Sequence, residues 1–383
     1  MNRVLSRLVS SFSAALLFSL SCHAAGPQVS PSTTCKAVLL MENSSGEVLF
    51  EHNAHDPRPP ASMIKMLVAY VTMKKVNEGV VNLEDVISAS AYASKIGGSQ
   101  VYLKQGEQFT LQQLLEALMI QSANDAAVAI AEHIGGSPEG FVELMNQQAQ
   151  ELGMNETRVA SPHGLPPGKG QEADVTSAYD MALLARAIIR DFPRLHELSG
   201  QSEGSFRDGT FGMRNHNDLV RNYPGCDGIK TGYYREAGFC VTATAQRNNV
   251  RMIAVTMGCD TKKDRAAETA RLLSLGFAQF KALKLVERGA EAGRAVPVKG
   301  GATEQVKPVA ARDLNVVVKS GEHKKVRQEL SLCDGLQAPV AAGTKCGSVA
   351  FLLGDRELGR VEYLVKESIP KATLRQRIMR IFR

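Results

Sequence analysis

The order of two hydrophobic periodicities constrains the fold of this chain more than any other feature. After a predicted β-hairpin over residues 36–54, apolar residues recur with a helical period over residues 62–78, 110–136, 137–154 and 176–193, the last with Thr176 as the expected N-cap. Residues 226–258 then form short β-branched runs separated by turns, which predict antiparallel strands, and a helix is expected from about Lys263 to Phe280. Helices followed by strands predict an α+β fold with helices packed against an antiparallel sheet.

A second change in composition near residue 284 predicts another domain. The segments LNVVVK, KVRQELSL and RVEYLVK alternate in hydrophobicity among Gly and Pro turns, as in a small all-β domain. A chain of 383 residues is long enough to bury two cores. We therefore expect a large domain over residues 26–283, an all-β domain over 284–365, and a basic segment over 366–383.

The first 25 residues have the layout of a secretory signal peptide. Arg3 and Arg7 precede a short apolar run from Leu8 to Leu20, and small residues follow at Ala24 and Ala25. Cys22 offers a lipoprotein alternative, although the residue three positions before it is serine rather than leucine. Either way, the mature protein is expected outside the cytoplasm.

Seven cysteines are present, and removal of the signal peptide would leave six in an oxidising compartment. Cys333 and Cys346 lie in one small segment and could bridge, whereas Cys226, Cys240 and Cys259 cannot all pair among themselves. None of them has the spacing of metal ligands, so structural roles are expected.

The net charge of +6 is concentrated at the C-terminus. Residues 366–383 hold six basic residues against Glu367, a net +5, which leaves +1 for the rest of the chain. A nearly neutral body of this kind argues against a general nucleic-acid-binding protein.

Ser62 and Lys65 lie three residues apart at the start of an apolar helical stretch, within PPASMIKMLVAYV. Side chains at i and i+3 share one face of a helix, so the hydroxyl and the amine can touch. A helix that only packs in a core has no use for such a pair. Ser368 and Lys371 repeat the spacing, but Pro370 removes a helix hydrogen bond and disturbs the shared face.

Two further short motifs raise the Ser62–Lys65 pair above chance. Ser122-Ala123-Asn124 closes the apolar helical stretch at residues 111–121 and is the only Ser-x-Asn in the chain. Lys230-Thr231-Gly232 lies on a predicted strand. Three motifs in this order, each in a suitable predicted element, indicate one shared site.

With these motifs the chain resembles the low-molecular-mass penicillin-binding proteins of the serine D-alanyl-D-alanine carboxypeptidase type. Their Ser-x-x-Lys, Ser-x-Asn and Lys-Thr-Gly signatures are matched, and the similarity continues through LMIQSANDAAVAIAE, DMALLARAIIRDFP and DGIKTGYYREAGFCVTATA. The resemblance implies a transpeptidase domain like those of penicillin-binding proteins and β-lactamases, with an antiparallel sheet and a helical cluster. It also implies a small all-β domain and a C-terminal amphipathic helix after it.

The resemblance implies catalytic roles that physical chemistry supports. Ser62 would be the nucleophile and Lys65 the general base, because a buried amine can accept a proton once desolvation and a nearby cation lower its pKa. Lys230 would be that cation. Ser122 could relay the proton to the leaving amine, and Asn124 would orient Lys65 and the substrate amide.

By the same resemblance, the remaining motif residues bind substrate. The backbone N–H groups of Ser62 and Tyr233 would stabilise the oxyanion, and Gly232 is small enough for a substrate backbone to lie along the strand edge. A terminal carboxylate would be bound by Thr231, Lys230 and Arg265.

Several of these residues also have structural interpretations. Ser62 could be a helix N-cap, Asn124 a polar residue on a helix surface, and Arg265 part of a surface salt bridge. His163 could be a triad partner of Ser62, but a loop histidine beside Pro and Gly is more often structural. His216 stands where some relatives carry a second basic residue, which leaves the details of carboxylate binding open.

The sequence therefore predicts a serine D-Ala-D-Ala carboxypeptidase that trims peptidoglycan stem pentapeptides through an acyl-enzyme, with β-lactams acylating Ser62. No metal or organic cofactor is expected. One alternative is a serine β-lactamase, but the chain lacks a convincing Glu-x-x-Leu-Asn, and such enzymes lack the β-domain and the basic tail. The other is a non-catalytic cell-wall scaffold, against which the intact Ser62, Lys65 and Lys230 argue.

The basic tail predicts a membrane partner. After Pro370, the apolar residues at i, i+4, i+7 and i+8 share one helical face, with the arginines mostly elsewhere: Leu374, Ile378, Ile381 and Phe382. Such a helix suits an anionic membrane surface, so we expect a periplasmic protein attached peripherally to the inner membrane. The alternative is a terminal helix docked on its own domain.

Overall fold

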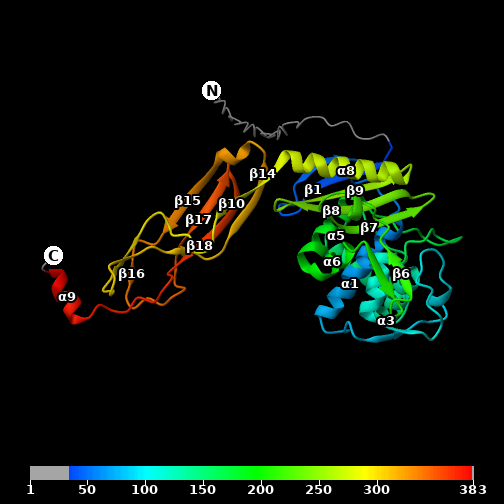
Figure 1. Ribbon diagram of the computed structural model, residues 1–383, viewed down its shortest axis with the longest axis horizontal. Helices are drawn as coiled ribbons and strands as arrows, with labels where there is room; N and C mark the ends of the chain where they lie inside the picture. Colours follow the sequence, from blue (N-terminus) through cyan, green and yellow to red (C-terminus); the bar gives the residue numbers. More distant parts are fainter. Residues whose placement is uncertain (1–33, 382–383) are drawn as a thin grey trace, which may run out of the picture. The chain divides into compact units, whose positions relative to one another are not determined.

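The computed structural model describes residues 34–381, and a five-stranded antiparallel sheet organises the larger part of them (Figure 1). The strand order is β2-β1-β9-β8-β7, with β1 at Ala37–Glu42, β2 at Val48–His52, β7 at Cys226–Tyr234, β8 at Gly238–Arg247 and β9 at Val250–Cys259. The predicted hairpin and the predicted antiparallel strands are both confirmed. Because β1 pairs with β9, the hairpin and the later strands form one sheet.

Helices cover both faces of this sheet. The helix α8 (Lys262–Gln279) packs on one face and α5 (Ala178–Asp191) on the other (Figure 1). All six residues of β1 are buried. Neighbouring residues of the strand face opposite sides: Leu39 belongs to the core on the α5 side and Leu40 to the core on the α8 side. A strand covered on both faces explains why this segment is continuously apolar rather than alternating.

The remaining helices form the cluster on the α5 side, except for the short α7. Their bounds are α1 at Lys65–Asn77, α2 at Leu111–Glu116, α3 at Asn124–Gly135, α4 at Pro138–Glu151, α6 at Pro193–Ser199 and α7 at Leu219–Asn222. Two small hairpins border the cluster, β3 (Val86–Ser88) with β4 (Gln108–Thr110), and β5 (Glu203–Phe206) with β6 (Phe211–Arg214).

Two helix boundaries differ from the prediction by one residue. The side chain of Ser177, not that of Thr176, caps α5 by accepting a hydrogen bond from the backbone N–H of Asp180. Thr176 is instead held in an isolated β-bridge with Arg58, so its backbone is already paired. The helix α8 ends at Gln279, because Phe280 begins a strand.

The apolar stretch at 111–121 is not one regular helix. After α2, residues Ala117–Gln121 form a single π-helical turn, and Ser122 then adopts a left-handed conformation with φ of 63°. The next helix, α3, begins at Asn124. This break places Ser122 and Asn124 at a junction between helices, where a π-turn often marks a functional site.

The C-terminal part is all β, as predicted, and has a core of its own. Its strands are β10 at Phe280–Val286, β11 at Val296–Lys299, β12 at Gln305–Val306, β13 at Val309–Ala310, β14 at Leu314–Lys319, β15 at Val326–Leu332, β16 at Leu336–Gln337, β17 at Lys345–Leu353 and β18 at Arg356–Leu364. They form sheets of order β13-β18-β17-β15, β10-β14 and β12-β11-β16. The exact domain boundaries stay a prediction.

The predicted C-terminal helix is short. It spans Leu374–Ile381 as α9, and Leu374, Ile378 and Met379 are exposed. Phe382 and the predicted signal peptide lie outside the described residues. Between residues 34 and 381, no helix combines the length and the apolar character needed to cross a membrane.

One disulfide joins two positions that are distant in the sequence. Cys35, just before β1, is bonded to Cys259 at the end of the neighbouring strand β9. The sulfurs of Cys333 and Cys346 lie 3.0 Å apart as free thiols, so the bridge considered for them is not formed. Cys226 and Cys240 are buried and free, in keeping with structural roles.

Candidate active site

Ser62 and Lys65 come together at the start of α1, as their spacing predicts. Ser62 lies in a 3₁₀ turn, η1 (Ala61–Ile64), and Lys65 is the first residue of the α-helix that continues it. Both side chains therefore lie on one face, and the Lys65 Nζ is 3.1 Å from the Ser62 Oγ. The turn starts from Ala61 with φ of 48°, a conformation that is unfavourable for a residue with a Cβ.

Lys65 is fully buried, and burial decides its charge. Desolvation lowers the pKa of the amine well below its usual value, and the positive charge of Lys230 lowers it further. The carboxylates of Asp174 and Asp125 act in the opposite direction, more weakly. The Lys65 Nζ also donates a hydrogen bond of 2.5 Å to the backbone carbonyl of His163. A neutral, oriented amine next to a serine hydroxyl can act as a base.

Ser122 and Lys230 form a second hydroxyl–amine pair. The left-handed conformation of Ser122 turns its side chain toward the strand β7, where the Lys230 Nζ donates a hydrogen bond of 2.8 Å to the Ser122 Oγ. Burial, and then the nearby Arg265, lower the pKa of Lys230 to about 7. Two lysines therefore share the site, and Lys65, whose pKa is lowered by burial and by the charge of Lys230, deprotonates first.

Asn124, which was expected to orient Lys65, forms no hydrogen bond with it within residues 34–381. Its side-chain Nδ2 donates to the carbonyl of Gly97 at 2.6 Å, and its backbone N–H donates to the carbonyl of Ser99 at 2.7 Å. The Asn124 Oδ1 is buried and has no hydrogen-bond partner among the described residues. A buried acceptor without a partner is costly, which makes this oxygen a candidate for binding a ligand N–H.

Gly232 is a glycine because β7 runs against the turn that carries Ser62. A Cβ at this position would lie 2.4 Å from the Pro60 carbonyl oxygen and 3.2 Å from the backbone nitrogen of Met63. The protein's own backbone therefore occupies the space that a Cβ on Gly232 would need, while Gly232 still lines the cavity beside Ser62 on the edge strand β7. Tyr233, the next residue, is 55% exposed and stacks on Phe239.

This contact predicts the effect of a single methyl group. Gly232→Ala is expected to lower the free energy of unfolding by about 1–3 kcal/mol, because the added Cβ must push β7 away from the Ser62 turn. Urea unfolding measures this. Gly212→Ala on β6 is the control, because a Cβ there meets nothing within 4 Å. A Gly232→Ala protein as stable as the Gly212→Ala protein would contradict the close approach.

A cavity of about 460 Å³ lies beside Ser62, and two of the three predicted carboxylate-binding residues, Thr231 and Arg265, line it. Its lining includes three serines, three residues of β7, an aspartate and several basic groups: Ser62, Ser99, Ser122, Thr231, Gly232, Tyr233, Asp218, Arg214, His216, Lys262 and Arg265. Arg265 is only 5% exposed, and no described residue accepts a hydrogen bond from its guanidinium. An almost buried, unpaired cation that faces a cavity suits an anionic ligand.

His216 lines this cavity as a neutral group. Burial, and then the charges of Lys230 and Lys262, lower its pKa to about 4. The Asp218 carboxylate that lines the same wall is paired with Lys262 at 2.6 Å and with Arg221 at 2.6 Å. His216 therefore adds no positive charge to the cavity, and Arg265 is an almost buried cation in its wall for which no described residue provides an acceptor.

His163 is not a triad partner of Ser62. Its Nδ1 accepts a hydrogen bond from the backbone N–H of Leu165, and burial and the proximity of Lys65 lower its pKa to about 4. Its contribution is the backbone carbonyl that orients Lys65. Within the described part of the chain, no cluster of three or more His, Cys, Asp or Glu residues could hold a metal ion.

Sequence reasoning missed two features of the site. The carbonyl of His163 has no side-chain signature, and only the Pro and Gly around it marked a defined turn. Asp174 is 6% exposed and holds that turn by accepting hydrogen bonds from the backbone N–H groups of Ala160 and Ser161. A carboxylate in a polar loop gives no sign of burial in the sequence, so periodicity could not have found it.

Known proteins match both parts of the chain. Residues 24–261 match the D-alanyl-D-alanine carboxypeptidase family, and residues 280–371 match the C-terminal domain of penicillin-binding protein 5. D-alanyl-D-alanine carboxypeptidase DacF of Bacillus subtilis is 34% identical over 88% of this chain and 86% of its own length. D-alanyl-D-alanine carboxypeptidase DacA of Haemophilus influenzae is 32% identical over 95% of this chain and 93% of its own length.

Solved structures agree. Penicillin binding protein 5 from Haemophilus influenzae matches with a TM-score of 0.68 and 31% identity, covering 90% of this chain and 99% of that one. Penicillin-binding protein D2 from Listeria monocytogenes, in its ampicillin-bound form, matches with a TM-score of 0.60 and 27% identity over 66% of this chain and 100% of that one. The chain is thus a low-molecular-mass penicillin-binding protein and belongs to the D-alanyl-D-alanine carboxypeptidase family.

Proposed function

We propose that this protein is a serine carboxypeptidase that removes the terminal D-alanine from peptidoglycan stem pentapeptides. The observation that carries the proposal is the hydrogen bond of 3.1 Å between the Ser62 hydroxyl and a fully buried Lys65 amine, at the edge of a cavity that also contains an unpaired Arg265. A nucleophile, a base with a lowered pKa and a carboxylate-binding cation are the three groups that such a reaction needs.

In the acylation step Ser62 attacks the carbonyl carbon of the penultimate D-alanine. The Lys65 amine accepts the hydroxyl proton as the new C–O bond forms, and the carbonyl becomes a tetrahedral oxyanion. The backbone N–H groups of Ser62 and Tyr233 stabilise that oxyanion, because fixed dipoles need no reorganisation. The close contact between η1 and β7 around Gly232 holds these two N–H groups in a fixed relation.

The leaving group is the amine of the terminal D-alanine, and it needs a proton. Ser122, oriented by its hydrogen bond from Lys230, donates its hydroxyl proton to the departing nitrogen and takes up the proton that Lys65 had accepted, so that Lys65 is neutral again. The C–N bond breaks, and free D-alanine leaves an ester on Ser62. Water then attacks that ester with Lys65 again acting as the base, which releases the shortened peptide and restores the hydroxyl.

Substrate binding uses two groups that have no hydrogen-bond partner among the described residues, the Arg265 guanidinium and the Asn124 Oδ1, together with Thr231 and Lys230. Arg265, with Thr231 and Lys230, binds the terminal carboxylate. The unpaired Asn124 Oδ1 accepts the N–H of a substrate amide. The contacts of Arg265 and of the Asn124 Oδ1 each satisfy a polar group that otherwise has no partner among the described residues, which favours the bound state.

A charge change near Lys65 tests its role as the base. Asp174→Asn removes a negative charge that raises the pKa of Lys65, so the pKa of Lys65 falls. Because the active form has neutral Lys65, kcat/KM is lost as pH falls through that pKa, and the acid limb of the profile is expected to move to lower pH. The profile of kcat/KM against pH measures the shift.

The control for this experiment is Glu172→Gln. Glu172 lies on the same segment but is exposed and paired with Arg158 at the surface. The Glu172→Gln substitution should leave the acid limb of the kcat/KM profile at the wild-type pH. An Asp174→Asn profile that does not move, or that moves to higher pH, would contradict the assignment of the base.

The direct test of the function is release of D-alanine from a peptide that ends in D-Ala-D-Ala. Turnover by the wild type and none by Ser62→Ala supports the carboxypeptidase. Rapid hydrolysis of penicillin without D-alanine release would indicate a β-lactamase instead. A folded protein that neither releases D-alanine nor is labelled by penicillin would be a scaffold.

The proposal extends to location. Residues 1–25 direct export, and α9 with the basic residues around it attaches the protein to the outer face of the inner membrane. What supports this is the exposure of Leu374, Ile378 and Met379 together with the basic residues of the same segment. Exposed apolar side chains beside cations suit an anionic lipid surface.

Removing the tail tests the attachment. Deletion of residues 367–383 is expected to move the protein from the membrane fraction to the soluble fraction, and D-alanine release per molecule should stay unchanged. Fractionation followed by penicillin labelling measures both. A truncated protein that remains with the membrane would refute the role of the helix.

A further inference from the structure

Residues 97–103 bring Ser99 to the wall of the catalytic cavity and are hydrogen-bonded to Asn124 of the Ser-x-Asn motif. Ser99 lines the cavity, and its carbonyl accepts the backbone N–H of Asn124 at 2.7 Å. Gly98 has φ of 81°, and a Cβ there would lie 2.6 Å from the Asn124 Nδ2. The position of this wall is therefore tied to the position of Asn124.

Asp125 fixes the next part of the same segment. Its carboxylate is 1% exposed and accepts hydrogen bonds from the backbone N–H of Val101 at 3.2 Å and of Leu103 at 2.9 Å. Between them, Tyr102 adopts a left-handed conformation with φ of 59°, which is unfavourable for a bulky residue. Such a conformation persists only where the surroundings enforce it.

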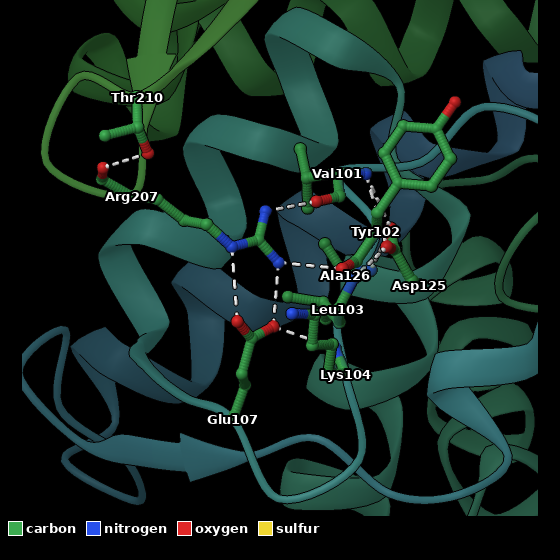
Figure 2. Close-up of polar contacts among 9 residues, drawn as sticks. All are labelled: Val101, Tyr102, Leu103, Lys104, Glu107, Asp125, Ala126, Arg207 and Thr210. Carbon is green, nitrogen blue, oxygen red and sulfur yellow. Dashed lines mark hydrogen bonds and ion pairs between the residues drawn. The ribbon is translucent and has the colours of Figure 1, made fainter.

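Arg207 holds this segment from the opposite side (Figure 2). It extends from the β5–β6 hairpin and donates hydrogen bonds to the carbonyls of Val101 at 2.5 Å and Tyr102 at 2.7 Å. The same guanidinium forms a bidentate ion pair with the Glu107 carboxylate, with an Nη2–Oε2 distance of 2.7 Å and an Nε–Oε1 distance of 3.2 Å. Asp125 therefore holds the amides and Arg207 the carbonyls of one short segment.

The hairpin that carries Arg207 also forms part of the cavity. Arg214, on its second strand, lines the cavity, and the backbone N–H of Arg214 donates to the Gln121 side chain at 3.1 Å. Gln121 directly precedes Ser122. The Arg207 contacts thus join two walls of the cleft, the one with Ser99 and the one with Arg214.

We infer that Arg207 is a positioning residue of the peptidase: by joining the hairpin to residues 101–107 it sets the separation of the two cavity walls, at Ser99 and at Arg214, between which the peptide binds. The inference rests on the proposed function. Arg207 touches neither Ser62 nor Lys65, so it acts on substrate placement and not on the bond-breaking groups. Loss of its contacts widens the cleft for substrate and transition state alike.

The test compares kinetic constants of the full-length protein with a peptide ending in D-Ala-D-Ala. Arg207→Lys keeps the positive charge beside Glu107 but cannot reach two carbonyls and a carboxylate at once. It is expected to raise KM about tenfold and to leave kcat within about twofold, because weakened uniform binding changes KM alone. A purely structural loss would reduce the fraction of active enzyme, which lowers kcat and leaves KM unchanged.

The matched control is Arg360→Lys in the β-domain. Arg360 forms a bidentate ion pair with Glu357 of nearly the same geometry, with an Nη2–Oε2 distance of 2.6 Å and an Nε–Oε1 distance of 3.2 Å. It lies in another domain and far from the three motifs in the sequence. The Arg360→Lys enzyme should have the same kcat and KM as the wild type. Arg207→Gln serves as a second variant, with an expected KM at least as high as that of Arg207→Lys.

The outcomes separate the inference from the proposed function. A wild type that releases no D-alanine overturns the proposed function and this inference with it. An active wild type beside an Arg207→Lys enzyme with unchanged KM overturns the inference alone. So does an Arg207→Lys enzyme that loses kcat at constant KM.

Discussion

Lys65→Met is expected to release D-alanine at least about 10³-fold more slowly than the wild type, because it removes the general base of both chemical steps. Lys65→Arg should be equally inactive. A guanidinium stays protonated at every accessible pH, so it places a fixed positive charge where the active enzyme has a neutral amine and cannot accept the Ser62 proton. Steady-state turnover and the rate of acylation by benzylpenicillin measure the two losses.

Folding of these variants can be checked separately. Lys65→Met replaces a buried amine, whose ionised form is strongly disfavoured by desolvation, with an apolar side chain of similar length. Its thermal midpoint should therefore be no lower than that of the wild type, as is common where a functional group is stabilised at the expense of the fold. Lys74→Met is the control on the same helix, since Lys74 pairs with Glu151 at a partly exposed position. A Lys65→Arg enzyme with near wild-type turnover would exclude Lys65 as the base.

Arg265→Gln is expected to lower kcat/KM about 10²-fold, mainly through KM. The loss corresponds to a charge-assisted hydrogen bond of about 1.5–3 kcal/mol between the guanidinium and the substrate carboxylate. We expect this loss because Arg265 is almost buried, faces the cavity and has no hydrogen-bond acceptor among the described residues. Lys230 should also become easier to protonate, because Arg265 lowers its pKa.

A second substrate distinguishes carboxylate binding from general damage. The wild type should strongly prefer a peptide with a free terminal carboxylate over the same peptide with a terminal amide, and Arg265→Gln should lose most of that preference. Arg271→Gln is the control on the same helix, because Arg271 is paired with Glu268 on a partly exposed face. An Arg265→Gln enzyme that keeps the full preference would place the carboxylate elsewhere.

Much of the fold was predictable because it depends on periodicity and local turn chemistry. The N-terminal hairpin, the helical periods and the later β-branched strands all appear close to their expected bounds. The pairing of β1 with β9 was not predictable, because both strands are buried on two faces and their pattern carries no partner information. The same limit applies to the disulfide between Cys35 and Cys259, which depends on that pairing.

The smaller differences between the predicted and the observed helices depend on tertiary contacts or have no sequence signal. Thr176 and Ser177 are both good capping residues, and the β-bridge to Arg58, a tertiary contact, decides between them. The π-turn before Ser122 also has no sequence signal, because its residues continue the apolar helical pattern.

For the site, the sequence predicted which side chains meet but not how the backbone holds them. The spacing of the motifs and their predicted elements indicated one shared site, and the side chains that meet there are Ser62, Lys65, Ser122 and Lys230. The carbonyl of His163 that orients Lys65 could not be predicted, since every residue has a carbonyl. Asn124 was expected to contact Lys65 but instead fixes the wall of the cleft, a role that depends on a loop whose path is set by tertiary contacts.

The central claim is that Ser62 is the nucleophile activated by Lys65, and mass spectrometry of the protein after exposure to benzylpenicillin tests it most directly. The account predicts one covalent adduct, on the peptide that contains Ser62, which is absent in Ser62→Ala and formed at least about 10³-fold more slowly in Lys65→Met. A folded wild type without an adduct, or with an adduct on another residue, would contradict the account.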